Sequence, residues 1–365
     1  MSIDRVIISG GGTGGHIFPA LAIAEGIKAQ NPAVQILFVG ALGRMEMEKI
    51  PLAGYEIKGL NIVGFNRKNM LKNLILPIRL TQSIVGAYRI LKAFKPQLVV
   101  GVGGYASGPT LKVANWLKYP TLIQEQNSFP GKTNLLLAKK AAAICVAYTG
   151  MEKYFPENKI HLTGNPVRSD LVSAENKKNE AYAFYQLDPS KKTILVIGGS
   201  LGARSINEAM VSILKNYKPE DAVQVIWQCG KGYIEEYKQC EFSVPVKVLA
   251  FIERMDYAYS IADVVVSRAG ATSVSELSII GKPSILVPSP NVSEDHQTKN
   301  ALALSSVGAA VLVEDNRLLI DLLPAIEKIL GNSDFAGELS KEIRNLGKPK
   351  ATDDIVLICN KIVQS

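Results

Sequence analysis

Short apolar runs alternate with longer segments of helical periodicity along the chain, from its first residues to about Leu330. The short runs are rich in Val and Ile, which is typical of strands buried on both faces of a sheet. This alternation predicts parallel sheets whose strands are joined by crossover helices. The predicted strands lie at residues 5–9, 35–39, 98–101, 121–124, 143–147, 160–162, 193–197, 224–228, 246–249, 264–267, 284–287 and 310–313.

The two halves of the chain begin alike, because in each a strand runs straight into a glycine cluster: VIISGGGTGG near the start and ILVIGGSLGA from Ile194. We therefore expect two α/β domains, each a Rossmann-like, doubly wound parallel sheet. The first should span 1–165 and the second 166–345, with a helix in 346–365 that crosses back to the first. Open sheets of this kind bind ligands at the carboxyl ends of their strands, so the two domains should face a shared cleft.

The composition is that of a packed globular enzyme, with 47% hydrophobic and 20% charged residues in a chain of 365. The four cysteines lie far apart without CxxC spacing, which indicates reduced thiols rather than disulfides or a zinc site. The N-terminal segment lacks the features of a signal peptide, and no apolar run approaches the roughly 18 residues of a spanning helix. We expect a cytoplasmic protein that meets any membrane from the side.

The net charge of +8 is unevenly distributed. Residues 1–165 contain 19 Lys and Arg against 8 Asp and Glu, whereas residues 166–365 contain 22 against 25. The basic half should therefore meet an anionic partner, such as an anionic membrane surface or a diphosphate substrate. The basic residues are scattered and form no nucleic-acid-binding motif, so nucleic acid is not an expected partner.

The first glycine cluster, GGGTGGH at residues 10–16, allows close backbone approach to a ligand and begins a helix whose N–H groups attract anions. It contains Thr13, Gly14 and Gly15. The second strand lacks the terminal acidic residue of dinucleotide-binding folds, which argues against an NAD enzyme. A tight strand-to-helix turn explains the glycines equally well, but His16 at the mouth of the turn favours proton transfer near neutral pH.

Two further motifs follow strands of the first half. GVGGYASGP at 101–109 presents mostly bare backbone beside Tyr105 and leaves room for a bulky substrate. QEQNSFPGKTN at 124–134 places Glu125, Gln126 and Asn127 directly after a buried strand. Polar groups there need partners, which a sugar would supply, although hydrogen bonding within the scaffold is a competing explanation.

The second half repeats the anion-binding pattern. GGSLGA at 198–203 contains Ser200, whose hydroxyl could donate to a diphosphate, and Arg168 could reach the same phosphates unless it forms an interdomain or surface pair. RAGATSVSE at 268–276 begins a helix with small residues, and Glu276 lies a turn further in. There its carboxylate could bind both hydroxyls of a ribose, or merely cap the helix or carry surface charge.

A last motif, SPNVSEDHQTKNA at 289–301, has His296 and Gln297 at a helix entrance, suited to sugar hydroxyls. The sequence has no acidic pair after a strand on the cleft side, and its three histidines are separate, so neither a metal nor another cofactor is expected. The charge of a leaving diphosphate would then fall to helix N-termini and Arg168.

Seven motifs occur in order between residues 10 and 301: GGGTGGHIFPALAIA, GVGGYASGP, QEQNSFPGKTN, GNPVR, GGSLGARSIN, RAGATSVSEL and DHQTKNA. Together they resemble glycosyltransferase family 28, in particular the bacterial transferases that convert lipid I to lipid II. The resemblance implies a GT-B fold, UDP-GlcNAc as donor on the second domain and lipid I, undecaprenyl-diphospho-MurNAc-pentapeptide, as acceptor on the first. It also implies transfer with inversion and without metal, a peripheral position on the cytoplasmic membrane face, and partners among wall-synthesis and division proteins.

Site residues follow from the same resemblance. His16 is the expected general base and Glu125 the reserve candidate. Ile252 matches a residue whose backbone contacts uracil, and Glu276 matches the ribose ligand. The other substrate-binding matches are Thr13, Gly14, Gly15, Tyr105, Asn127, Arg168, Ser200, Ala271, Thr272, Ser273, His296 and Gln297.

NRKNMLKNLILPIRL at 66–80 mixes apolar and basic residues, as an interfacial membrane element would, although a helix packed on its own domain has the same pattern. Two other functions share these features. A UDP-GlcNAc 2-epimerase would have the same donor site without needing a lipid acceptor. A non-catalytic UDP-sugar-binding scaffold of wall synthesis would not need His16.

Overall fold

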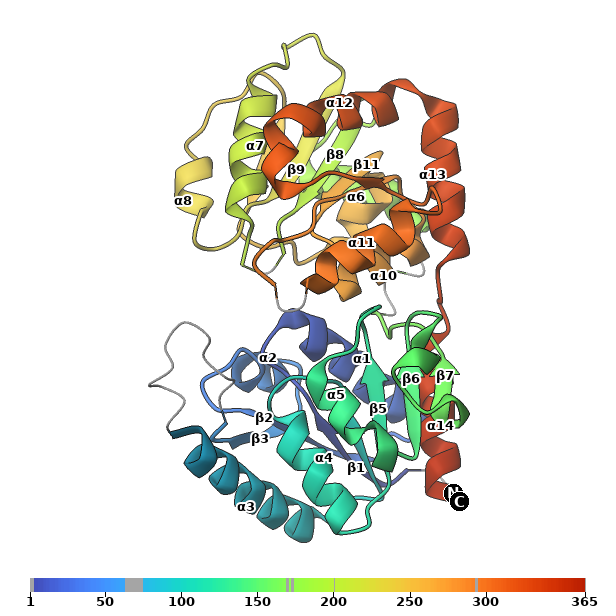
Figure 1. The fold of residues 1–365 in the computed structure, drawn as a ribbon. Helices are drawn as coiled ribbons and strands as arrows, with labels where there is room; N and C mark the ends of the chain where they lie inside the picture. The colour runs from blue at the N-terminus through green and yellow to red at the C-terminus, as the bar shows by residue number, and fades with distance from the viewer. Residues whose placement is uncertain are drawn as a thin grey trace. The chain divides into compact units, whose positions relative to one another are not determined.

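The protein is described by a computed structural model covering residues 3–62, 75–168, 171, 174–199, 201–292 and 295–364. The chain forms two compact units, shown in Figure 1. The first unit comprises Met1–Arg168 together with Lys350–Ser365, and the second comprises Ser169–Pro349. The C-terminal segment therefore belongs with the first unit.

The first unit is built on a sheet of seven parallel strands in the order β3-β2-β1-β4-β5-β6-β7. The strands are β1 (Arg5–Ser9), β2 (Gln35–Ala41), β3 (Glu56–Leu60), β4 (Leu98–Gly101), β5 (Thr121–Glu125), β6 (Ala143–Val146) and β7 (Ile160–Leu162). The helices are α1 (Gly14–Gln30), α2 (Glu46–Leu52), α3 (Leu76–Phe94), α4 (Ser107–Trp116), α5 (Lys132–Leu137) and α14 (Ala351–Gln364), with 3-10 turns η2 (Ala138–Lys140), η3 (Met151–Lys153) and η4 (Glu157–Lys159).

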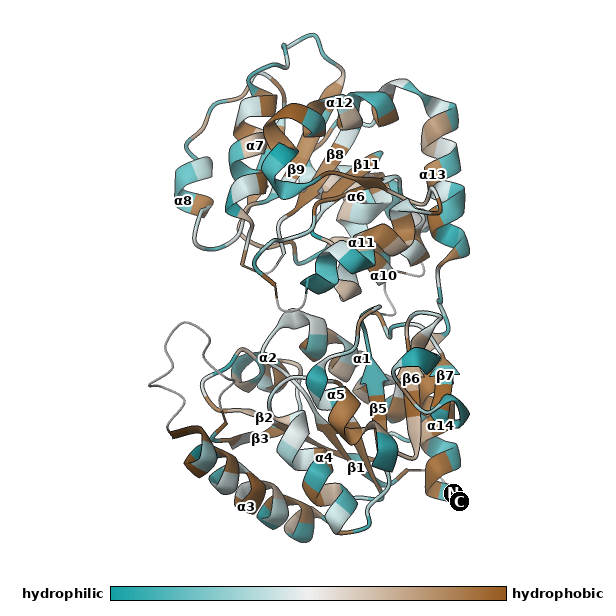
Figure 2. Ribbon diagram, viewed as in Figure 1, coloured by the Kyte–Doolittle hydropathy of each residue, from teal (hydrophilic) through white to brown (hydrophobic). Residues whose placement is uncertain are grey.

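Alternate residues of the strands enter two separate apolar cores, one on each face of this sheet. Ile7 packs in the core that contains residues of α3 and α4, whereas Ile8 packs in the core with residues of α1 and α14. Gly26 lets α14 approach α1, because a Cβ there would lie 2.6 Å from the Thr352 methyl group. Figure 2 shows the apolar strands enclosed by helices of mixed polarity.

The second unit has six parallel strands in the order β10-β9-β8-β11-β12-β13. They are β8 (Lys192–Ile197), β9 (Val223–Gln228), β10 (Val246–Leu249), β11 (Val264–Ser267), β12 (Ser284–Leu286) and β13 (Val311–Leu312). The helices are η6 (Ala174–Lys177), α6 (Lys178–Tyr185), α7 (Arg204–Leu214), α8 (Ile234–Tyr237), α9 (Met255–Ile261), α10 (Ala271–Ile280), α11 (His296–Ser305), η8 (Asp315–Arg317), α12 (Leu318–Gly331) and α13 (Ser333–Asn345). Apolar cores with α7 and α12 on one face, and with α6, α9 and α10 on the other, complete the unit.

Both sheets have a topological switch point, where the chain leaves two neighbouring strands in opposite directions. It lies between β1 and β4 in the first unit and between β8 and β11 in the second. Ligands of open α/β sheets bind at such points, outside the carboxyl ends of the strands. The glycine clusters after β1, β4 and β8 all lie at these edges.

Every strand predicted from the sequence is present, and the predicted class of two parallel-sheet α/β domains is confirmed. The strand that the prediction missed is β3, which lies at the edge of the first sheet. Its sequence EIKGL contains no apolar run, because Glu56 and Lys58 interrupt it. Both side chains are exposed, and they pair with each other at 2.7 Å.

Candidate functional site

The two glycine clusters of the first unit pack backbone against backbone. Gly12, Gly103 and Gly104 all have positive φ, at 89°, 93° and 85°. A Cβ on Gly104 would overlap the carbonyl oxygen of Gly11. Only glycine fits this contact, so these glycines are required by the tight turns themselves. The same backbone packing forms the surface next to His16.

His16 lies in the first turn of α1, directly over the second glycine cluster. Its Nδ1 lies 3.0 Å from the Gly11 carbonyl oxygen. A carbonyl can only accept, so Nδ1 donates this hydrogen bond and the basic lone pair of the neutral ring is on Nε2. A Cβ on Gly103 would lie 2.8 Å from Nε2, so the imidazole rests on bare backbone.

Gly104→Ala should destabilise the first unit by about 2–5 kcal/mol, because positive φ costs about 1–2 kcal/mol and overpacking about 1–3 kcal/mol. Gly150→Ala is the matched control, since Gly150 has φ of 77° but nothing within 4 Å of its added Cβ. Its cost should be about 1 kcal/mol. Urea unfolding measures both variants, and equal losses would show that the contact between the clusters has no energetic importance.

A buried carboxylate that the sequence did not reveal supports the first cluster. Glu46, at the start of α2, is 1% exposed and accepts hydrogen bonds from Gly12 N at 2.7 Å and Ala41 N at 3.0 Å. Both its oxygens are thus engaged by the backbone, which leaves Glu46 unlike the ribose-binding acid of dinucleotide enzymes. The only sequence signal was an acidic residue shortly after the second strand.

Glu125, the reserve candidate for the base, has both oxygens engaged by the loop that follows β5 and by the start of α5. It is 1% exposed and accepts from Asn127 N and Gly131 N, each at 3.0 Å, from Asn134 Nδ2 at 2.8 Å, and from Asn127 Nδ2 at 3.3 Å. Burial raises the pKa of Glu125, although these hydrogen bonds act to lower it. This geometry suits an anchor of the loop that holds Asn127.

Thr13, His16, Tyr105 and Asn127 follow β1, β4 and β5, which are neighbours in the sheet, so the structure brings them to one edge. Thr13 caps no N–H of α1 with its side chain, and Tyr105 is half-exposed. Gly14 and Gly15 form the first turn of α1. Arg168 ends the N-terminal segment of the first unit, which runs from Met1 to Arg168.

The second unit presents two helix N-termini at its switch point. α7 follows the glycine cluster of 198–203, where a Cβ on Gly230 would lie 2.5 Å from the Leu201 carbonyl oxygen. α10 begins after Gly270 with Ala271, Thr272 and Ser273, and no side chain caps either helix. Thr272 Oγ1 is buried and, within the described part of the chain, has no hydrogen-bond partner. Ser200 falls outside the described residues.

Glu276 lies one turn into α10 and is 8% exposed. Its Oε2 accepts a hydrogen bond from the hydroxyl of Tyr259, at 3.1 Å, which orients the carboxylate. Nothing in the sequence indicated that Tyr259 contacts Glu276, because its position has only the pattern of a buried core residue. Because Glu276 is buried, the alternative that it is a surface charge is excluded.

The remaining predicted residues of this unit also follow strands at its carboxyl edge. Ile252 is buried in the loop after β10. His296 begins α11, and Gln297 Oε1 accepts from Ser289 N at 2.9 Å, which leaves the amide nitrogen of Gln297 to donate. The described donor-site candidates, which follow β10, β11 and β12, are therefore gathered at one edge of the second sheet.

Arg268, the first residue of the RAGATS motif, has a structural role, because its guanidinium bonds to other residues of the second unit. Its guanidinium donates to the carbonyl oxygens of Val287 and Pro288 at 3.2 and 3.1 Å and to Ser205 Oγ at 2.8 Å. It also pairs with Asp315. Arg268 thus ties the start of α7 to the loops after β11 and β12.

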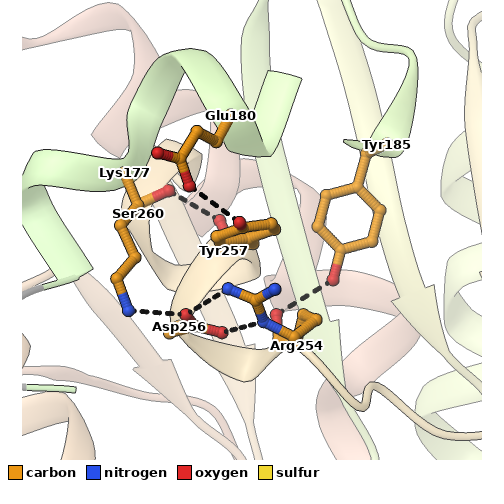
Figure 3. A network of polar contacts seen from close by, with 7 residues as sticks. All are labelled: Lys177, Glu180, Tyr185, Arg254, Asp256, Tyr257 and Ser260. Carbon is orange, nitrogen blue, oxygen red and sulfur yellow. Dashed lines mark hydrogen bonds and ion pairs between the residues drawn. The ribbon is translucent and has the colours of Figure 1, made fainter. Parts of the chain in front are cut away.

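A second polar network lies between α6 and α9 of this unit (Figure 3). Asp256 is 1% exposed and receives two hydrogen bonds from Arg254, at 3.0 and 2.8 Å, and one from Lys177 at 2.8 Å. These cations hold the pKa of Asp256 well below its usual range.

Asp256→Asn should cost the second unit stability at neutral pH but much less in acid. The folded pKa of Asp256 lies below its unfolded value, so its contribution is present above about pH 4 and is lost as pH falls. Urea unfolding of both proteins at several pH values measures the difference. A difference that stays constant from neutral pH into acid would contradict the ionic contribution.

Both units match one family of enzymes. Residues 6–146 match the glycosyltransferase family 28 N-terminal domain, and residues 193–355 match the glycosyltransferase family 28 C-terminal domain. The chain belongs to glycosyltransferase family 28.

Two relatives span almost the whole of this family 28 chain. It is 52% identical over 361 residues to a protein of Flavobacterium psychrophilum, covering 99% of this chain and 98% of that protein. It is 54% identical over 362 residues to a protein of Parabacteroides distasonis, covering 98% of each. Both are named UDP-N-acetylglucosamine--N-acetylmuramyl-(pentapeptide) pyrophosphoryl-undecaprenol N-acetylglucosamine transferase.

Solved structures agree with the family 28 assignment. The crystal structure of Acinetobacter baumannii MurG has a TM-score of 0.76 and 31% identity, covering 98% of this chain and 99% of that one. The UDP-GlcNAc 2-epimerase of Neisseria meningitidis, solved with UDP-GlcNAc bound, has a TM-score of 0.68 at 17% identity over 98% of this chain and all of that one, and shares the fold alone. The predicted GT-B class is confirmed, and the chain is a glycosyltransferase.

The described residues of this family 28 chain can be compared with the predictions about metal binding and membrane contact. Among the described residues no cluster of His, Cys, Asp and Glu could hold a metal ion, and no helix there is long and apolar enough to span a bilayer. Most of the predicted interfacial segment, residues 66–74, falls outside the described residues. Its end enters α3, where Ile78, Leu80, Val85 and Tyr88 are exposed.

Proposed function

We propose that this glycosyltransferase transfers GlcNAc from UDP-GlcNAc to the 4-hydroxyl of the MurNAc-pentapeptide of lipid I, giving lipid II and UDP in peptidoglycan synthesis. The observation that carries the proposal is the 52% identity, across both units, to a transferase named for this donor and this undecaprenol-linked acceptor. Each unit contributes a group of polar residues at the carboxyl edge of its sheet, as two-substrate transfer requires.

The mechanism is a single displacement with inversion at the anomeric carbon. His16 acts as the general base, since its Nδ1–H is committed to the Gly11 carbonyl and Nε2 is the nitrogen able to take the proton of the acceptor hydroxyl. Glu125 is less suited to that role, because four hydrogen bonds from the following loop and the start of α5 occupy its oxygens. It positions Asn127 instead, beside the acceptor, with Thr13 and Tyr105.

The second unit binds the donor. The N-termini of α7 and α10 stabilise the diphosphate as it leaves, with Arg168 as a further cation. The unpartnered hydroxyl of Thr272 supports a phosphate contact at α10, beside Ala271 and Ser273. Glu276 takes the ribose hydroxyls, and the backbone of Ile252 takes uracil. His296 and Gln297 bind hydroxyls of the transferred sugar.

The enzyme works from the cytoplasmic face of the membrane as a peripheral protein. The exposed apolar residues of α3 and the basic charge of residues 1–165 support this location. A lipid-linked acceptor requires such contact, because its prenyl chain stays in the bilayer.

The proposal is tested by incubating the full chain with radiolabelled UDP-GlcNAc and lipid I in detergent. We expect a labelled lipid product and one UDP per product, and neither without the acceptor. Conversion of UDP-GlcNAc to its 2-epimer without lipid I would instead establish the epimerase alternative. Binding of UDP-GlcNAc without any turnover would establish a non-catalytic scaffold.

A further inference from the structure

The polar network around Asp256 holds the end of the loop of residues 250–254, which connects β10 to α9 (Figure 3). This loop leaves the carboxyl edge of the sheet and contains Ile252. Its last residue, Arg254, is held through its backbone as well as its side chain. The hydroxyl of Tyr185 donates to the Arg254 carbonyl at 3.1 Å, and burial raises the pKa of Tyr185 to about 12, so the hydroxyl remains a donor.

The side chain of Arg254 is held on two sides. Its guanidinium makes the two hydrogen bonds to Asp256 and lies 3.5 Å from the ring centroid of Tyr257. The hydroxyl of Tyr257 in turn donates to Glu180 Oε2 of α6 at 2.8 Å. Lys177 supplies the second cation of Asp256. The loop end is therefore tied to η6, α6 and α9 together.

We propose that Asp256, acting through Arg254, is a positioning residue that holds the 250–254 loop in the conformation that binds the donor's uracil. The inference rests on the proposed function, in which the Ile252 backbone contacts the base. A loop fixed before binding loses little conformational entropy when the nucleotide arrives. If the ties are cut, only a fraction of molecules has the competent loop, and the apparent affinity falls by that fraction.

This role has a specific kinetic signature. The loop contacts the nucleotide and not the reacting sugar, so loosening it weakens UDP-GlcNAc and UDP by the same factor. Turnover at saturating donor and the KM for lipid I remain unchanged, because the bound complex, once formed, has the same geometry. General destabilisation of the unit would not separate donor KM from kcat in this way.

The test compares three variants of the full chain at a temperature at which each is folded. Asp256→Asn removes the ionic tie, and Tyr185→Phe removes only the hydroxyl bonded to the Arg254 carbonyl. Asp321→Asn is the matched control, since it breaks another Arg–Asp pair of the same unit, with Arg317, within η8 and α12. Donor KM, lipid I KM, kcat and the dissociation constant of UDP by calorimetry are measured for each.

We expect donor KM and the UDP dissociation constant to rise together, about tenfold in Asp256→Asn and about threefold to fivefold in Tyr185→Phe, with kcat within about twofold of wild type. Asp321→Asn should match wild type. Unchanged UDP affinity in Tyr185→Phe and Asp256→Asn overturns the inference, as does a fall in kcat at constant KM. If Asp256→Asn does not fold, Tyr185→Phe decides.

Failure of the proposed function gives a different result, because the wild-type chain would then form no labelled lipid. The UDP titrations do not depend on transfer and still decide whether the network sets nucleotide affinity.

Discussion

The substitution His16→Ala is expected to lower kcat by about 10²-fold or more, while the KM for UDP-GlcNAc changes little. The substitution removes the nitrogen that takes the acceptor proton, whereas the proposed donor contacts all lie on the second unit or at Arg168. Initial rates at saturating donor and acceptor measure the loss. A rise in donor KM at constant kcat would contradict the assignment of His16 as base.

Two controls separate proton transfer from structure. His16→Gln retains a donor for the Gly11 carbonyl but offers no basic nitrogen, so it should be as inactive as the alanine variant. His161→Ala removes an exposed histidine of β7 and should retain wild-type kcat. Recovery of activity in the glutamine variant would indicate that His16 acts by positioning the glycine cluster.

Glu276→Ala should raise the KM for UDP-GlcNAc and the inhibition constant of UDP by about 10²-fold or more with a smaller change in kcat. A carboxylate that accepts both ribose hydroxyls makes two hydrogen bonds to a charged group, each of which contributes about 1.5–3 kcal/mol. The ribose is remote from the reacting carbon, so the loss falls on binding. Steady-state kinetics with varied donor and UDP inhibition measure it.

Tyr259→Phe provides the graded comparison for this site. It leaves the carboxylate in place and removes only the hydroxyl that orients it at 3.1 Å, so donor KM should rise by about threefold to tenfold. Equal and small effects in both variants would mean that Glu276 is a buried structural acid and not the ribose ligand.

The architecture was largely predictable because its causes are local. Strands buried on both faces have continuous apolar sequence, and glycine clusters mark where the chain turns sharply at their ends. β3 was missed because it has no such local pattern, since this edge strand exposes Glu56 and Lys58 to solvent. Its existence depends on pairing with β2, which no local pattern of EIKGL reports.

The sequence by itself determined the class of fold, the family and the position of His16 at the end of a glycine cluster. Only the tertiary structure decided which polar groups are already committed, such as Glu46 to Gly12 and Glu125 to its own loop. A carboxylate has the same chemistry in every sequence, but its availability depends on which donors surround it when it is buried. Those donors often come from distant segments, as Gly12 and Glu46 illustrate, and only the folded chain brings them together.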